Sequence, residues 1–103
     1  MATIVTLDSA KIALLVAVRQ GRVHYDPRYT APDFEKEPDP PFWTKRATQR
    51  LRPLKKWELV ELVEDEADQF GVCPYRLTEI GELLLDEALA AEAAENDGPG
   101  ALA

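Results

Sequence analysis

The sequence predicts an α+β domain built from three main helices, a small antiparallel β-hairpin and one short extra strand. Apolar residues recur at helical spacing in three separate stretches. Two short runs that contain valine and leucine flank a polar turn, a pattern typical of a hairpin. The length of 103 residues suits one domain and is too short for two sizeable cores.

The first helix is expected to run through residues 11–20. Asp8 or Ser9 can cap its amino end, and Gly21 stands where a C-cap glycine belongs. The middle of this helix is apolar on nearly every side, which predicts burial on several sides. A short strand is expected to follow at residues 22–25.

Residues 27–42 predict an extended proline-rich loop, because five prolines lie between positions 27 and 41. Proline fixes φ and removes a backbone donor, so at most one helical turn is expected here, at residues 33–36. Four aromatic residues are expected to hold this loop against the body of the domain: Tyr29, Phe34, Phe42 and Trp43.

A second helix is expected at residues 44–56, where Ala47, Leu51 and Leu54 form one apolar face. Pro53 is expected to kink this helix or end its regular part. Alternating apolar and polar residues at 58–64 then predict a half-buried strand. A polar turn at 65–71 and a second strand at 72–77 complete the hairpin.

Thr78 is expected to cap a third helix. Its predicted core positions are six apolar residues: Ile80, Leu83, Leu84, Leu85, Ala88 and Leu89. The folded domain is expected to span residues 1–92. Residues 93–103, rich in alanine and ending in a glycine- and proline-containing stretch, are expected to form a disordered tail.

Composition argues against several function classes. The single cysteine, Cys73, and the single histidine, His24, leave no intramolecular disulfide, no cysteine-rich zinc site and few acid–base schemes. We therefore expect no enzyme, catalytic residue, metal site or cofactor. The longest apolar run, residues 12–18, is far short of the roughly 20 residues that span a bilayer. The chain also lacks the pattern of a signal peptide, so a cytoplasmic location without membrane contact is expected.

The strongest functional signal is the distribution of charge. The net charge is −7, which repels nucleic acid unless the basic residues are gathered in one place. Six of the twelve lysines and arginines lie between residues 40 and 57, with no acidic residue among them. A basic helix of this kind can neutralise phosphates and read base edges of double-stranded DNA. The expected DNA-binding residues are Lys45, Arg46, Thr48, Gln49, Arg50, Arg52, Lys55 and Lys56.

Within this set, Arg46, Gln49 and Arg50 are the expected base readers, and the lysines and Arg52 are expected to contact phosphates. The alternative is a solvated helix face whose cations pair with the acidic body of the domain. Trp43 and Trp57 bracket the basic stretch. Aromatic residues among basic ones can stack on exposed bases, but in so small a domain a core role is the expected one.

Two stretches resemble known motifs. Residues 51–60 (LRPLKKWELV) resemble the end of a winged-helix recognition helix entering its wing, usually L-x-x-L-x-x-x-G-L-V. Residues 75–84 (YRLTEIGELL) resemble the closing Y-x-L-T-x-x-G-x-x-L-L of MarR-like and PadR-like regulators. The resemblance covers residues 44–88 and, in outline, the first helix. The overall form is similar to small winged-helix proteins of actinobacteria and their phages.

This resemblance implies a winged helix that binds DNA as a transcriptional regulator or phage accessory factor. In the family, the threonine caps the last helix, and the glycine, here Gly81, lets that helix pack closely. MarR-like proteins dimerise through their terminal helices, so the resemblance also implies a homodimer. The expected dimer seam consists of Leu14, Val18, Leu85 and Leu89.

The chain departs from the family pattern in three ways. A proline-rich loop stands where a helix normally precedes the recognition helix. Glu58 replaces the usual glycine, and Pro53 lies inside the helix. The expected wing tip, residues 64–68, is acidic where DNA-reading wings carry arginine or lysine. These departures favour an alternative function, a winged helix that binds a protein partner, such as a small phage protein that docks on a host protein through its acidic surface.

Overall fold

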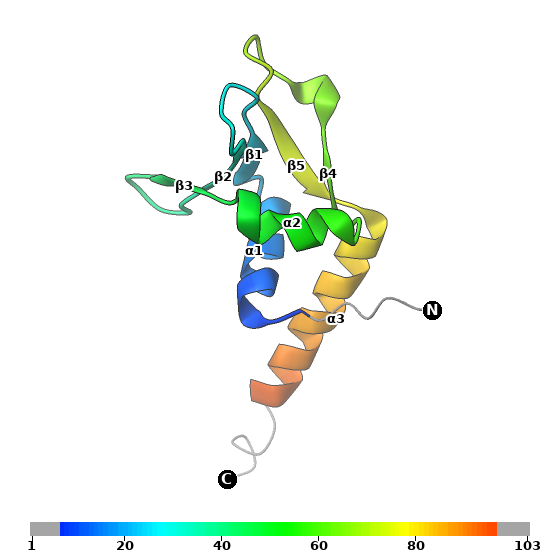
Figure 1. Cartoon of the computed structure of the whole chain (residues 1–103). Coiled ribbons are helices and arrows are strands. Elements are labelled where there is room, and N and C mark those ends of the chain that lie inside the picture. The colour runs from blue at the N-terminus through cyan, green and yellow to red at the C-terminus, as the bar shows by residue number, and fades with distance from the viewer. Residues whose placement is uncertain (1–6, 97–103) are drawn as a thin grey trace.

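Three α-helices and a five-stranded antiparallel sheet make up an α+β fold (Figure 1). This computed structural model describes residues 7–96. The sheet has the strand order β3-β2-β1-β5-β4. In chain order the elements are α1 (Ser9–Arg19), β1 (Val23–Tyr25), β2 (Asp33–Lys36), β3 (Thr44–Arg46), α2 (Thr48–Lys56), β4 (Val60–Leu62), the 3₁₀ turn η1 (Glu64–Glu66), β5 (Cys73–Leu77) and α3 (Glu79–Asn96).

The first helix and strand confirm their sequence prediction. The Asp8 carboxylate accepts a hydrogen bond from the backbone N–H of Lys11 at 2.8 Å, as an N-cap does. Gly21 ends the helix region with φ +74°, a left-handed conformation that costs glycine least. Strand β1 then pairs with β5, where His24 lies opposite Pro74. This pairing joins the amino-terminal strand to the β4–β5 hairpin.

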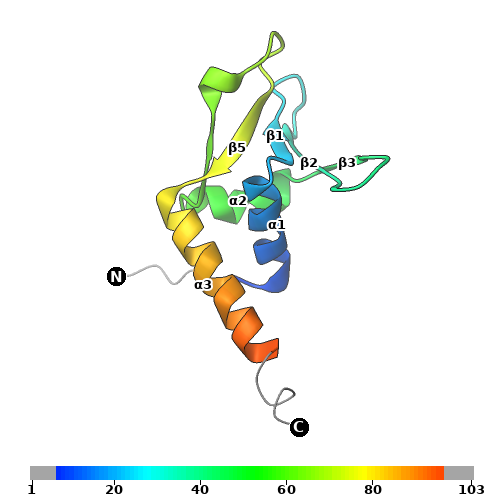
Figure 2. The same ribbon diagram turned by 180° about the vertical axis from the view of Figure 1, so that it is seen from behind.

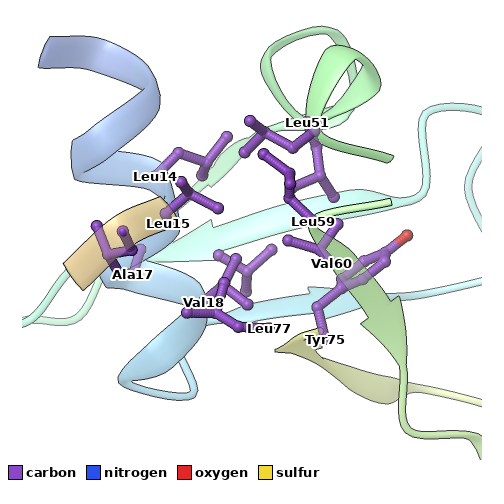
Figure 3. Close-up of a cluster of buried hydrophobic side chains, with 12 residues drawn as sticks. Leu14, Leu15, Ala17, Val18, Leu51, Leu59, Val60, Tyr75 and Leu77 are labelled. Atoms are coloured by element: carbon purple, nitrogen blue, oxygen red, sulfur yellow. The ribbon is translucent and has the colours of Figure 1, made fainter. Parts of the chain in front are cut away.

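The hydrophobic core lies between the three helices and the β1-β5-β4 part of the sheet. Figure 3 shows side chains of α1 meeting those of α2, β4 and β5. Leu15, Leu51, Leu59 and Leu85 are completely buried, and each comes from a different segment of the chain. Apolar burial of this kind is the main contribution to stability, and it fixes the orientation of α2.

Helix α3 begins as the sequence predicts and packs unusually closely on the start of β4. The Thr78 hydroxyl accepts from the Gly81 N–H at 3.1 Å and donates to the Glu58 carbonyl at 2.6 Å. A Cβ added to Gly81 would lie 2.0 Å from the backbone oxygen of Leu59. Only glycine therefore fits at position 81, which confirms the expected close packing.

Glu58, which stands where the resembled motif has glycine, has φ +58°. This left-handed conformation is disfavoured for residues with a Cβ. The backbone turn that glycine would make is thus kept by a non-glycine residue. It connects the end of α2 to β4, and the Glu58 N–H donates to the Lys55 carbonyl at 3.0 Å.

The prediction of a loop at residues 27–42 is wrong in part. Residues 33–36 form strand β2 instead of a helical turn, and β2 pairs with both β1 and β3. Residues 44–46 form β3, so α2 begins at Thr48 instead of position 44. The prolines flank β2 without interrupting it, at positions 32 and 38, which is compatible with strand pairing.

The aromatic residues of this region also differ from expectation. Phe34 is partly buried, stacks on His24 with ring centroids 5.6 Å apart, and meets the edge of Tyr29. Tyr29 and Phe42 are about half exposed, and Trp43 is 73% exposed. The expectation that four aromatic residues hold this segment against the body of the domain is therefore wrong for Phe42 and Trp43, whereas Tyr29 packs on the partly buried Phe34.

Three further predictions about helices are compared with their observed bounds and burial. Of the two effects expected of Pro53, an end of the helix is wrong, because α2 continues to Lys56. Ile80 and Leu83 are 54% and 61% exposed, so they are not core positions of α3. Helix α3 extends to Asn96, which places residues 93–96 in a helix and not in a disordered tail, while residues 1–6 and 97–103 lie outside the described part. None of the helices described is both long enough and apolar enough to cross a membrane.

Candidate nucleic-acid interface

Helix α2 turns one face to the core and the other to solvent. Leu51 and Leu54 are fully buried. At 100° per residue, the positions opposite them are Gln49, Arg52 and Lys56, and all three are exposed. The helix lies in front of α1 in Figure 1 and behind it in Figure 2, so this face points away from the rest of the helices. We call these three residues the α2 outer face.

Lys45 and Arg46 lie on β3, not on a helix, and both are exposed. Lys45 is opposite Glu35 in the strand register, and Arg46 is opposite Phe34. Because side chains alternate along a strand, the two basic residues point to opposite faces of the sheet. The eight predicted DNA-binding residues are therefore not on one continuous surface.

Two buried carboxylates on β2 engage part of the predicted set. Asp33 is 1% exposed and Glu35 is 9% exposed. Arg50 donates to Glu35 at 2.7 Å, and the Lys55 ammonium lies 3.7 Å from Asp33. Arg22 also lies 3.4 Å from Glu35. Charged groups buried to this degree require such partners.

Asp33 makes two further hydrogen bonds, one through its backbone and one through its carboxylate. The backbone N–H of Asp33 donates to the Thr48 hydroxyl at 3.0 Å, and the Tyr75 hydroxyl donates to the Asp33 carboxylate at 2.5 Å. Burial, and then the Asp33 carboxylate, raise the pKa of Tyr75 well above its ordinary value, so its hydroxyl remains a donor. Sequence reasoning missed this network, because Asp33 and Glu35 are separated from α2 along the chain by a proline-rich loop and β3.

The alternative of intramolecular ion pairing thus holds for part of the basic stretch. Arg50 and Lys55 pair with Glu35 and Asp33, and Lys45 lies 4.0 Å from Glu37. Arg46, Arg52 and Lys56 form no ion pair within residues 7–96. The cations that remain available to a partner are consequently those of the α2 outer face and Arg46, with Lys45 only weakly held.

The turn between β4 and β5 is acidic and exposed. Glu64, Asp65 and Glu66 form η1, with every side chain open to solvent. Asp68 accepts backbone hydrogen bonds from Phe70 and Val72, so it also has a structural role. In both views this turn lies at the far end of the molecule from the carboxyl end of α3 (Figures 1 and 2). Its negative charge opposes close approach of phosphates.

The predicted dimer seam does not fit the structure. Leu14, Val18 and Leu85 are at most 2% exposed within a single chain, and Leu89 packs partly against the same core. Leu14, Val18 and Leu85 have already lost their contact with water and Leu89 has lost part of it, so the four side chains offer little apolar area to a second copy. The exposed apolar residues of α3 are Ile80 and Leu83, which the sequence assigned to the core.

The remaining polar residues of interest have structural surroundings. Arg28 pairs with Asp26 at 2.7 Å and lies over the Phe70 ring, which joins two loops. Burial, followed by the charge of Lys36, lowers the pKa of His24, and burial raises the pKa of the Cys73 thiol. No group of three or more metal-ligating side chains lies together in the described part of the chain.

No family model matches the chain, and no curated protein or solved structure matches it either.

Proposed function

We propose that this chain is a winged-helix protein that binds double-stranded DNA, with α2 as its recognition helix and the β4–β5 hairpin as its wing. The element order and the pairing of β1 with β5 support this arrangement. So do the left-handed backbone at Glu58 and the close approach at Gly81, since both occupy glycine positions of the resembled motifs. A role as a transcriptional regulator or phage accessory factor follows from the resemblance.

The observation that carries the proposal is the α2 outer face. Gln49, Arg52 and Lys56 are exposed on one side of a helix whose opposite side is anchored in the core. An α-helix fits the major groove of B-DNA, where arginine and glutamine can pair with guanine and adenine edges. Arg52 and Gln49 are the base-reading candidates, and Lys56 is a phosphate contact. Arg46 at the amino end of α2 adds a second phosphate contact.

The buried acids change the roles expected for two residues. Arg50 is held by Glu35, so it is assigned to fixing β2 against α2 and not to reading bases. Lys55 lies against Asp33 in a similar way, so it too is assigned to holding β2 against α2. With a net charge of −7 and few available cations, DNA affinity should depend strongly on salt and on this small set of residues.

The test is fluorescence anisotropy of a labelled duplex, titrated with protein between about 50 and 200 mM salt. The variant Arg52→Gln/Lys56→Gln removes two charges from the α2 outer face. Lys56 is the phosphate contact of this pair, so the salt slope should fall by about 0.9. The loss of affinity between about 50 and 200 mM salt would then be about 3.5-fold smaller than for the unmodified protein.

The matched control is Arg19→Gln/Arg76→Gln, which removes the same net charge elsewhere. Arg19 pairs with Glu82 and Asp86 of α3, and Arg76 pairs with Glu61 across the hairpin. This control should leave the salt slope unchanged. Equal slopes for both variants, or no binding by the unmodified protein at 50 mM salt, would refute DNA binding through α2.

A protein-interaction module remains the second candidate, favoured by the apolar residues near the start of α3. Ile80 borders a hollow of about 430 Å³ between α2, β4 and α3, and Leu83 is exposed one turn further along the helix. Exposed apolar residues beside the acidic β4–β5 hairpin would suit a basic protein partner or, at Ile80 and Leu83, a second copy of the chain. Absence of DNA binding at low salt would favour this candidate.

A further inference from the structure

The β2–β3 hairpin carries two exposed aromatic residues at its tip. Trp43 is 73% exposed and Phe42 is 49% exposed. Tryptophan is usually among the most effective residues for burying apolar surface, so a surface tryptophan needs an explanation. The hairpin projects sideways from the body of the domain in both views (Figures 1 and 2), which leaves its tip accessible to a partner.

The tip is held in one conformation by its own backbone. The Glu37 N–H donates to the Trp43 carbonyl at 2.8 Å, and the Phe42 N–H donates to the Asp39 carbonyl at 2.9 Å. Prolines at positions 38, 40 and 41 fix φ at three further residues. Phe42 has φ +58°, a conformation that non-glycine residues seldom adopt. A rigid tip loses little conformational entropy when it binds.

Basic residues adjoin the aromatic tip. Lys45, the second residue of β3, follows Trp43 by two positions in the chain. Arg46 follows Lys45 on the opposite face of β3 and forms no ion pair with the side chains described in residues 7–94. Glu37 and Asp39 are the acidic residues of this hairpin loop, and Glu37 lies 4.0 Å from Lys45. Lys36, Lys45 and Arg46 outnumber them, so residues 36–46 carry a net positive charge within an acidic chain.

We propose that the β2–β3 hairpin tip is a base-stacking element, in which Trp43, supported by Phe42, stacks on an unpaired base of DNA. Exposed aromatic rings next to cations are the two components of binding sites for unpaired nucleic acid, since every base has a π-face and every phosphate a charge. The hairpin adjoins the amino end of α2 through Ala47, so a DNA bound by α2 lies within reach of the tip. The statement that the tip reaches DNA bound by α2 rests on the proposed function.

The ligand class is therefore a duplex that contains a bulge, mismatch or single-stranded junction. Stacking of this kind is independent of salt, in contrast to phosphate contacts. Trp43 variants and α2 variants should consequently change the salt dependence of DNA binding in different ways. A Trp43 variant should lower affinity by the same factor at every salt concentration, whereas Arg52→Gln/Lys56→Gln should change the slope.

The experiment compares an intact duplex with the same duplex carrying a bulge of unpaired thymines, using anisotropy at several salt concentrations. Trp43→Ala should weaken binding to the bulged duplex on the order of 10-fold, with an unchanged salt slope and little effect on the intact duplex. Trp43→Phe keeps an aromatic ring and should retain most of the affinity. Trp43 is exposed, so neither substitution removes core packing.

A second measurement reports on Trp43 directly. Trp57→Phe leaves Trp43 as the sole tryptophan, and its fluorescence should be quenched by the bulged duplex and not by the intact one. If Trp43→Ala binds the bulged duplex as well as the unmodified protein does, the inference is wrong even where duplex binding through α2 holds. If the intact duplex is not bound but the bulged one is, in a Trp43-dependent way, then duplex recognition by α2 is wrong and base stacking stands. No binding to either DNA overturns both.

Discussion

Replacement of Gly81 by alanine tests how closely α3 packs on the start of β4. The new Cβ would lie 2.0 Å from the Leu59 carbonyl oxygen, whereas real contacts of this kind are longer than 3.0 Å. The first turn of α3 must therefore move by about 1 Å. The obstacle is backbone, and not the end of a flexible side chain, so it cannot rotate away.

The cost can be worked out from what this movement disturbs. The Thr78 N–H donates to the same Leu59 carbonyl at 3.0 Å, and the Thr78 hydroxyl donates to Glu58 at 2.6 Å. Losing these two bonds costs about 1 kcal/mol each. Overpacking of a tight contact adds about 1–3 kcal/mol, while alanine regains about 1 kcal/mol of helix propensity. The expected net loss in free energy of unfolding is about 2–4 kcal/mol.

Urea and thermal unfolding followed by circular dichroism measure this loss. For a domain of this size it corresponds to a decrease in Tm of roughly 15 °C. Gly21→Ala is the matched control, because its added methyl group meets no atom within 4 Å and only its φ of +74° is unfavourable. That control should lose about 1–2 kcal/mol. If Gly81→Ala is as stable as the unmodified protein, the close approach of α3 to Leu59 is refuted.

Two further predictions concern the backbone at Glu58 and the titration of His24. Glu58→Gly should stabilise the fold by about 1 kcal/mol in urea unfolding, because glycine adopts φ +58° without the Cβ penalty, and Glu58→Gln, which keeps that penalty, should not. The pKa of His24 is lowered from 6.5 in the folded state, so the unfolded chain binds the proton more readily. The free energy of unfolding should therefore fall as the pH drops below about 6.5 and be independent of this group above it. Asp8 and Asp26 titrate only at lower pH, because the pKa values of these two carboxyl groups are lowered from 3.8. Above the pH range in which they titrate, His24→Phe should abolish the decrease in the free energy of unfolding. An unchanged pH profile would contradict the assignment.

Elements specified by local chemistry were predictable from the sequence. The Asp8 cap and Gly21 delimit α1, alternation marks β4, the polar turn at 65–71 precedes β5, and Thr78 begins α3. Each of these signals depends on residues a few positions apart, so it survives without knowledge of the fold. Gly81 was also predictable, through a motif whose physical reason is the backbone contact with Leu59.

Strands β2 and β3 were not predictable in the same way. Their pairing partners are distant or separated by a proline-rich turn, and β3 is exposed throughout. In β2 the inward-facing residues are Asp33 and Glu35, the reverse of the usual alternation in which apolar residues face inward. A polar residue faces the core only where the tertiary structure supplies its partner, and here that partner comes from α2 and β5.

The inward-facing acidic residues of β2 also explain why the charge pattern predicted more DNA contacts than the structure leaves available. Charge along a sequence counts cations but does not record which acids lie against them after folding. Asp33 and Glu35 are buried beneath α2 and pair with Lys55 and Arg50, so these two cations are held on the flanks of the helix. The charge that α2 presents outward is then reduced to Arg52 and Lys56 beside Gln49. Under the proposed function, a short helix with so few contacts needs a second point of attachment to bind DNA tightly. Because the β4–β5 turn is acidic, we propose the projecting β2–β3 hairpin as that second point.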